Sequence, residues 1–279
     1  MKKPDAGIRV NVDPANPGQF FACCGLLELA DRAGSGAEGW FADGTFRIAT
    51  DATLEVILQL LSTCVAEEVT VLKSGLTVQP LIAPLKVVFD GSQPFALTLD
   101  SWMITRIEKR KATTAANPPW NFWSGQQTSH RIWRDLQKAL AKQLPAISPE
   151  RIEDLWSQRT LLSGRFGFDP GAAWNALDVG FSPNEQGLDV ASSPAVELFA
   201  AIGLQRFRPS VADDRQSFTY ATWGVPLAPS VAVAAASGVI TIPPTVHFLG
   251  RVISRGSYAA LGQSTRIRGE NHDRFEKVR

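Results

Sequence analysis

The chain has 279 residues, of which 44% are hydrophobic, and its formal net charge is +1. This length and hydrophobicity allow a sizeable core and argue against intrinsic disorder. Three cysteines are too few for a disulfide framework or a four-ligand metal site, and no run of about 18 apolar residues could span a bilayer. The start lacks a signal-peptide hydrophobic region. We therefore expect a cytoplasmic protein without a metal site and without membrane contact.

The first hundred residues combine short strand signals with two helix signals. Asn16-Pro17 offers an N-cap followed by proline at the first helical position, Asp43-Gly44 is a two-residue hairpin signal, and Asp51 is placed to cap a second helix. In chain order the pattern predicts a strand at 8–13, a helix at 18–33, a hairpin around 43–44, a helix at 54–64, and strands at 69–72, 85–89 and 95–99. This series predicts an α+β fold with small, largely antiparallel sheets and packed helices, with ferredoxin-like elements in the N-terminal part.

The rest of the chain continues this mixture of helices and strands. Predicted helices lie at 129–144, which is amphipathic with a cationic face, at 149–156, and at 194–203, where glycine is expected to stop the helix. Residues 164–186 are rich in turn formers, and strands are predicted from 216 onward, at 239–242 and at 245–254. We divide the chain into residues 1–100, a basic aromatic loop and helix at 101–145, and residues 146–279, together forming one compact unit.

Catalytic signals are absent from the sequence pattern. The histidines, His130, His247 and His272, lack metal-ligand spacing, and neither a nucleophile elbow nor a phosphate loop occurs. Cys23 and Cys24 lie in an apolar helix, where cysteine is usually a small buried hydrophobe. We expect a binding protein that is not an enzyme and needs no cofactor.

Positive charge is concentrated between residues 101 and 142. This segment has eight Lys or Arg against two acids, a net charge of +6, whereas residues 1–100 sum to −5. Four of the eight tryptophans also lie in it. Cations suit phosphate and exposed aromatic rings can stack bases, but we expect Trp120–Trp123 to anchor the segment to the core.

The strongest phosphate-binding signal is Lys109-Arg110-Lys111. These cations precede 112–117, a run of low hydrophobicity that we expect to form a mobile loop presenting them outward. Asn117 could contact base edges or close a turn, and a second basic cluster near the C-terminus could extend the same face. The candidate nucleic-acid-binding residues are Arg106, Lys109, Arg110, Lys111, Asn117, Arg131, Arg134, Arg251 and Arg255.

Several long segments resemble a known family. These are NPGQFFACCGLLELADR (16–32), PPWNFWSGQQTS (118–129), GRFGFDPGAAWNALDVGFSPNEQ (164–186) and SSPAVELFAAIGLQRFRP (192–209). They are similar to a CRISPR-associated family of type I-U systems, also called I-G, assigned as divergent Cascade large-subunit-like proteins. The similarity extends over about residues 8 to 260.

The resemblance implies a non-catalytic subunit of an RNA-guided surveillance complex. Such a subunit works with other Cascade subunits that hold CRISPR RNA, and with a helicase-nuclease that cuts target DNA. Large subunits sense the protospacer-adjacent motif, help to open the duplex and recruit that nuclease. The chain is short for a large subunit, so we expect a separate small subunit to supply the helical bundle. Two alternatives stay open: a CRISPR RNA-processing endoribonuclease using His130 as general acid or base, and a purely architectural subunit.

Overall fold

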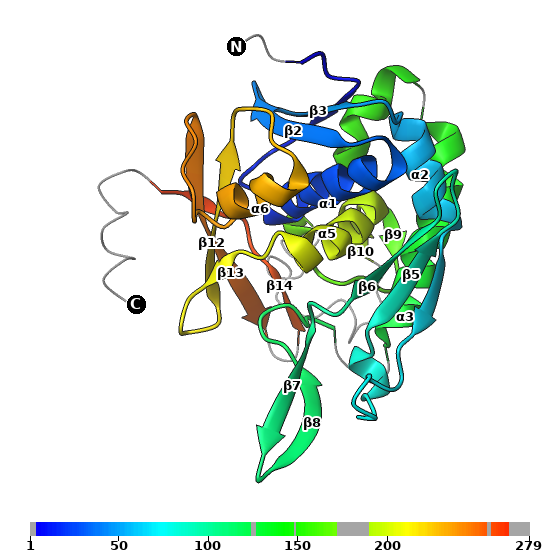
Figure 1. Cartoon of the computed structure of the whole chain (residues 1–279), viewed down its shortest axis with the longest axis vertical. Coiled ribbons are helices and arrows are strands. Elements are labelled where there is room, and N and C mark those ends of the chain that lie inside the picture. Colours follow the sequence, from blue (N-terminus) through cyan, green and yellow to red (C-terminus); the bar gives the residue numbers. More distant parts are fainter. Residues whose placement is uncertain (1–3, 124–126, 148, 172–189, 256–257, 268–279) are drawn as a thin grey trace.

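The computed structural model describes residues 4–123, 127–147, 149–171, 190–255 and 258–267 (Figure 1). Helices pack with several small antiparallel sheets, which confirms the predicted α+β class. The helices are α1 (Pro17–Ala33), α2 (Leu54–Thr63), α3 (Ser129–Gln143), α5 (Pro194–Arg206) and α6 (Pro229–Ala236), with 3-10 helices η1 (Pro80–Ile82), η2 (Leu144–Ala146) and η3 (Pro149–Ser157). Within the described ranges, every helix falls short of the length and apolar character that a membrane crossing requires.

The strands form five small sheets among the described residues. The strands are β1 (Ile8–Asn11), β2 (Ala37–Ala42), β3 (Thr45–Thr50), β4 (Val65–Glu68), β5 (Leu85–Phe89), β6 (Phe95–Leu99), β7 (Met103–Glu108), β8 (Lys111–Ala116), β9 (Thr160–Leu162), β10 (Val190–Ser192), β11 (Ser210–Val211), β12 (Ser217–Trp223), β13 (Thr245–Arg255), β14 (Tyr258–Leu261) and β15 (Thr265–Arg266). The sheet orders are β1-β3-β2, β4-β5-β6, β7-β8, β10-β9 and β11-β12-β13-β14, with β15 also paired to β13.

The first elements follow the strand, helix, hairpin, helix, strand order of ferredoxin-like folds. The sheet departs from that fold at its fourth strand, because β4 pairs with β5 and does not join β1. The predicted hairpin is present between β2 and β3, with positive φ at Asp43 and Gly44. The N-terminal part therefore has ferredoxin-like connectivity but only a three-stranded sheet around β3.

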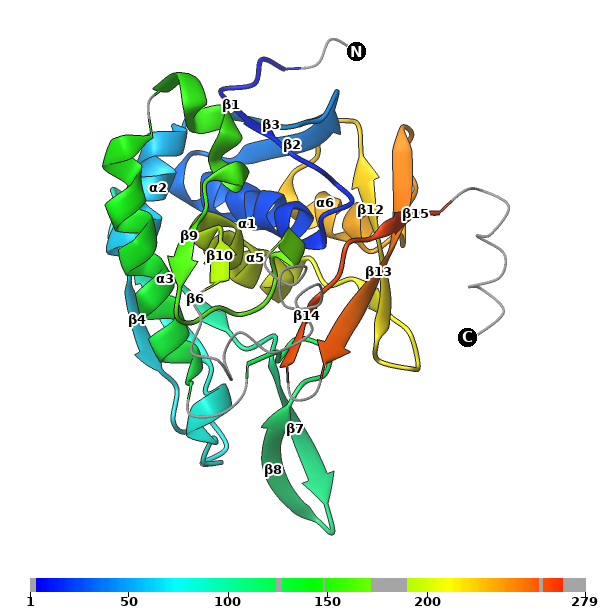
Figure 2. The same cartoon turned by 180° about the vertical axis from the view of Figure 1, so that it is seen from behind.

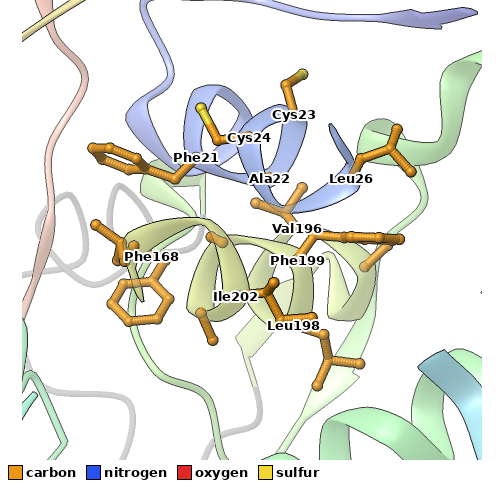
Figure 3. Packing of buried hydrophobic residues seen from close by; sticks show 14 of the residues in the cluster. Phe21, Ala22, Cys23, Cys24, Leu26, Phe168, Val196, Leu198, Phe199 and Ile202 are labelled. Carbon is orange, nitrogen blue, oxygen red and sulfur yellow. The ribbon is translucent and has the colours of Figure 1, made fainter. Parts of the chain in front are cut away.

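Helices α1 and α5 form the centre of the core. Asn16 caps α1 by accepting a hydrogen bond from the Gln19 amide (3.0 Å), and Ser193 caps α5 through the Val196 amide (3.3 Å). Both helices are apolar on nearly all sides and are buried over most of their length. They cross closely, and Figure 3 shows side chains from both, among them Phe21 and Phe199, around this contact.

A single cluster of buried apolar side chains contains residues from all three predicted segments. It includes Phe20 of α1, Trp102 before β7, Trp133 of α3 and Tyr220 of β12. Aromatic rings connect distant parts of the chain: the ring centroids of Phe20 and Tyr220 are 4.4 Å apart. The peripheral sheets are therefore attached to one continuous core.

Four details of the predicted elements are wrong. Thr53, not Asp51, caps α2, because the Asp51 carboxylate accepts from the Ser35 amide (2.9 Å). The strand expected at 69–72 lies earlier, as β4, where it can pair with β5. Residues 239–242 are not a strand: a bend at 239–240 follows α6, with the Ile240 amide bonded to the Ala234 carbonyl. Helix α5 continues past Gly203 to Arg206. Gly203 does not end the helix; it lies where α5 contacts α1.

Candidate nucleic-acid interface

Strands β7 and β8 form a hairpin that extends away from the body of the molecule (Figures 1 and 2). The two strands pair over six residues each, and Glu108 faces Lys111 in the register. Lys109 and Arg110 are thus the whole turn, with φ values of 48° and 66°. Positive φ at both turn positions is the signature of a type I′ hairpin.

The residues of this turn are unusual for its conformation. Type I′ turns favour Asn-Gly, because a left-handed backbone costs other residues roughly 1–2 kcal/mol each. Here two long cationic side chains hold these positions, and both are exposed. The turn therefore places two positive charges at the tip of the hairpin.

The predicted mobile loop at 112–117 is wrong, since Lys111–Ala116 is the second strand of this hairpin. Its sequence, KATTAA, lacks the alternation of large apolar and polar residues by which a strand is recognised. Pairing with β7 orders it instead. The cations are consequently carried by a two-stranded arm rather than by an irregular loop.

The two faces of the hairpin differ in chemistry. Arg106, Glu108 and Lys111 share one face, because residues alternate along a strand and Glu108 faces Lys111. Ile107 is on the other face opposite Ala112, and its side chain is 79% exposed. The end of the arm thus carries four cations and one acid, next to an exposed aliphatic side chain.

Asn117 lies at the base of the hairpin. Its amide side chain donates to the Ser101 carbonyl (2.7 Å), and its backbone N–H donates to the Trp102 carbonyl (2.7 Å). Of the two roles that the sequence leaves open, these contacts correspond to closing the turn.

The aromatic residues of the basic segment are buried, which confirms the anchoring role predicted for Trp120–Trp123. Trp102 stacks on Phe166 with ring centroids 5.3 Å apart, and the Trp123 indole donates to the Leu81 carbonyl (2.9 Å). The stacking of bases on these rings, considered from the sequence, is therefore incompatible with the structure.

A second basic surface follows the exposed side of α3. Its cations are Arg131, Arg134, Lys138 and Lys142, all of them exposed. The opposite side of the helix, including Trp133 and Leu136, is buried against the core. Arg131 lies 3.9 Å from Asp135, so part of this charge is offset within the helix.

The C-terminal candidates Arg251 and Arg255 both lie on β13. Arg251 is exposed on β13, opposite Ser217. Hydrogen bonds from the Gln216 and Ser217 amides, with a smaller contribution from Arg251, lower the pKa of Asp214, so Arg251 lies near an acid. Arg255 ends β13, and its side chain lies outside the described residues.

The nearby β14 and the base of the hairpin meet at one loop. The Leu261 amide donates to the Gly167 carbonyl (3.0 Å). A Cβ added to Gly167 would lie 3.1 Å from the Phe122 side chain and 3.4 Å from the Ala259 carbonyl. Phe166, next to Gly167, stacks on Trp102 at the base of the hairpin. The Gly167 loop thus connects β14 to the hairpin base, whereas α3 presents its cations from a separate element.

Groups suited to catalysis are tied into the fold. The His130 ring nitrogen Nε2 lies 3.1 Å from the Ala66 carbonyl, a contact that anchors α3 to β4. Burial raises the pKa of Cys23 and Cys24, as expected for buried thiols, and that of Cys64 to about 12. No group of His, Cys, Asp or Glu suited to a metal occurs among the described residues.

A buried polar cluster around Asp169 was missed by sequence reasoning. Asp169 accepts hydrogen bonds from the Asn16 side chain (3.3 Å) and from the Gly171 and Ser193 amides (3.1 and 3.4 Å). Its own amide donates to Glu197 of α5 (3.0 Å). The available signal is the pair of a capping residue and proline at 16–17 and 193–194, where α1 and α5 start, which recurs in the sequence at 169–170. Asp169 joins these starts, so we assign the cluster a structural role.

Comparison with protein-family models, with curated proteins and with solved structures finds no match to this chain.

Proposed function

We propose that this chain is a non-catalytic subunit of a type I CRISPR RNA-guided surveillance complex, and that the β7–β8 hairpin carries its contact with target DNA. The family resemblance of the segments at 16–32, 118–129, 164–186 and 192–209 supports the first part. The observation that carries the second is the turn Lys109-Arg110, two exposed cations in a backbone conformation that favours Asn-Gly.

A turn held in an intrinsically unfavourable backbone conformation is a reason to infer function. A two-stranded β-ribbon can enter the major groove of a duplex, and cations along it can bind the flanking phosphates. Because the neighbouring tryptophans are buried, the arm has charge but no aromatic platform for stacking single-stranded bases. These features favour a contact with duplex DNA near the protospacer-adjacent motif.

In this proposal the chain acts by binding. CRISPR RNA and the other Cascade subunits supply sequence recognition, and the helicase-nuclease that the complex recruits cuts the DNA. The chain would perform this role in the cytoplasm. The contact between His130 and Ala66 does not favour the alternative of RNA cleavage, since it gives the imidazole a structural use.

The first prediction tests the hairpin directly. Replacing Lys109 with Asn and Arg110 with Gly gives the turn its preferred residues and removes two positive charges. We expect slower hydrogen exchange in β7 and β8, weaker binding of the reconstituted complex to target duplex, and a salt dependence reduced by up to about two units of log-log slope. Arg9→Ala, an exposed cation in β1 at the opposite end of the molecule, is the control (Figures 1 and 2).

Two results would refute the proposal. Unchanged affinity and slope in the Asn-Gly variant would place the DNA contact elsewhere. A complex lacking this chain that still bound duplex and recruited the nuclease normally would remove the assigned role. If the complex failed to assemble without the chain but bound DNA normally with the Asn-Gly variant, the architectural alternative would be favoured.

A further inference from the structure

The hairpin is attached to the body through a polar clamp on the residues that precede β7. Gln205, in the last turn of α5, accepts hydrogen bonds from the Asp100 and Ser101 amides (2.9 and 2.7 Å). Its side-chain nitrogen donates to the Thr98 carbonyl and to the Asp100 carboxylate, both at 3.0 Å. Both donors and both acceptor positions of this one amide are thus used on the segment that enters the hairpin.

Asn117 closes the other side of the base. Its two hydrogen bonds to Ser101 and Trp102 connect the end of β8 to the residues just before β7. The Met103 amide donates to the Asp100 carbonyl (2.9 Å) in the same region. Gln205 therefore holds the incoming strand and Asn117 holds the outgoing strand to it.

The clamp is itself fixed to the core. Arg206, next to Gln205, donates to the Glu28 carboxylate of α1 (2.7 Å), and Glu28 also pairs with Arg32 (2.6 Å). The Glu28 side chain is buried. The last turn of α5 is consequently tied to α1 by this ion pair, and Gln205, the residue before Arg206, is tied to the base of the hairpin.

We propose that Gln205 and Asn117 are positioning residues that hold the β7–β8 arm in its DNA-binding orientation. This inference rests on the proposed function. A two-stranded hairpin is marginally stable by itself. The outer half of the β7–β8 hairpin is exposed, so contacts at its base must fix the direction in which it extends. Ordering the arm before binding reduces the entropy lost on binding. Loss of the clamp should therefore weaken affinity without removing any phosphate contact.

The second prediction concerns Gln205→Ala, with Gln93→Ala in the exposed β5–β6 loop as the matched control. We expect faster hydrogen exchange at the amides of Asp100, Ser101 and Asn117 than in the control. Binding of target duplex by the complex should weaken about threefold to tenfold, while the salt dependence keeps its wild-type slope, because the cations are unchanged. Asn117→Ala, which removes one side-chain contact at the base, should give the same pattern even if Gln205→Ala impairs folding.

The outcomes separate this inference from the proposed function. A loosened base with the affinity of the Gln93→Ala control would overturn the positioning role and leave the hairpin contact standing. Unchanged exchange at the base in both variants would also overturn it. Unchanged DNA binding by the Asn-Gly turn variant, with Gln205 and Asn117 intact, would refute the proposed function and this inference together.

Discussion

Two glycines set the distance between the central helices. A methyl group on Gly203 would overlap the carbonyl of Phe21, and one on Gly25 would overlap the carbonyl of Phe199. Both obstacles are backbone atoms, so a rotamer change cannot relieve the contact. The crossing of α1 and α5 thus depends on the absence of a side chain at these two positions.

The third prediction is that Gly203→Ala destabilises the protein. In an ordinary helix interior this change adds up to about 1 kcal/mol of stability. Here the helices must move apart, and we expect the free energy of unfolding to fall by about 1–3 kcal/mol, measured by denaturant titration. Gln59→Ala on the exposed side of α2 serves as the control and should change stability little. A Gly203→Ala protein as stable as wild type would contradict the packing described for these helices.

Gly203 also shows why single residues are hard to interpret from sequence. A glycine near the end of a helical pattern is typically a stop signal, and only the position of α1 shows that it is a contact residue. The cap Asn16 and the turn Asp43-Gly44, by contrast, act within four residues and were predicted correctly. These two local features could be inferred from sequence, whereas the close approach between distant helices could not.

At the level of elements, the first turn of α5 binds the loop that contains Gly167 and Asp169. The Glu197 carboxylate accepts hydrogen bonds from both amides, each at 3.0 Å. Burial raises the pKa of Glu197 above its ordinary 4.5, while the Asp169 amide and Arg165 oppose the shift. Because the raised pKa belongs to the folded state, this group contributes most stability below pH 4.5 and loses it as pH rises through the folded pKa.

The fourth prediction uses Glu197→Gln. The amide presents an N–H group where an oxygen accepted a hydrogen bond, so we expect a loss of about 1–3 kcal/mol in unfolding free energy. Since glutamine does not titrate, the difference between wild type and variant should shrink as pH rises above 4.5. Denaturation at several pH values measures this, with Glu38→Gln, at an exposed position of β2, as control. A difference that grows with pH would contradict the raised pKa.

Elements with a local sequence signal could be predicted, whereas elements that depend on pairing with distant residues could not. Strands β5, β6 and the long β13 could be predicted from their apolar residues, whereas their register could not. Helix α6 and strand β8 consist mainly of small residues, so periodicity gave no signal for either. The basic segment was therefore recognisable in sequence, while its form as a hairpin depends on pairing that composition does not indicate.

At the level of the whole molecule, one core supports the two basic surfaces. Trp102 precedes the hairpin and Trp133 lies on the inner side of α3, and both belong to the same buried cluster. The aromatic residues that lie near the cations in sequence are thus part of the same hydrophobic core. They hold the hairpin and α3 on one body, on which the cations of both elements face solvent.

The fifth prediction asks whether one nucleic acid contacts both surfaces. Replacing Arg134 and Lys138 of α3 with alanine should lower the salt dependence of duplex binding by up to about two units of log-log slope. The cations of α3 and of the hairpin belong to different elements, so the losses should add when this change is combined with the Asn-Gly turn. Titrations of the four complexes at several salt concentrations measure this, with Arg9→Ala as control. If the combined variant binds no more weakly than the turn variant alone, the α3 cations do not contact DNA. They then only keep this surface of the protein hydrated.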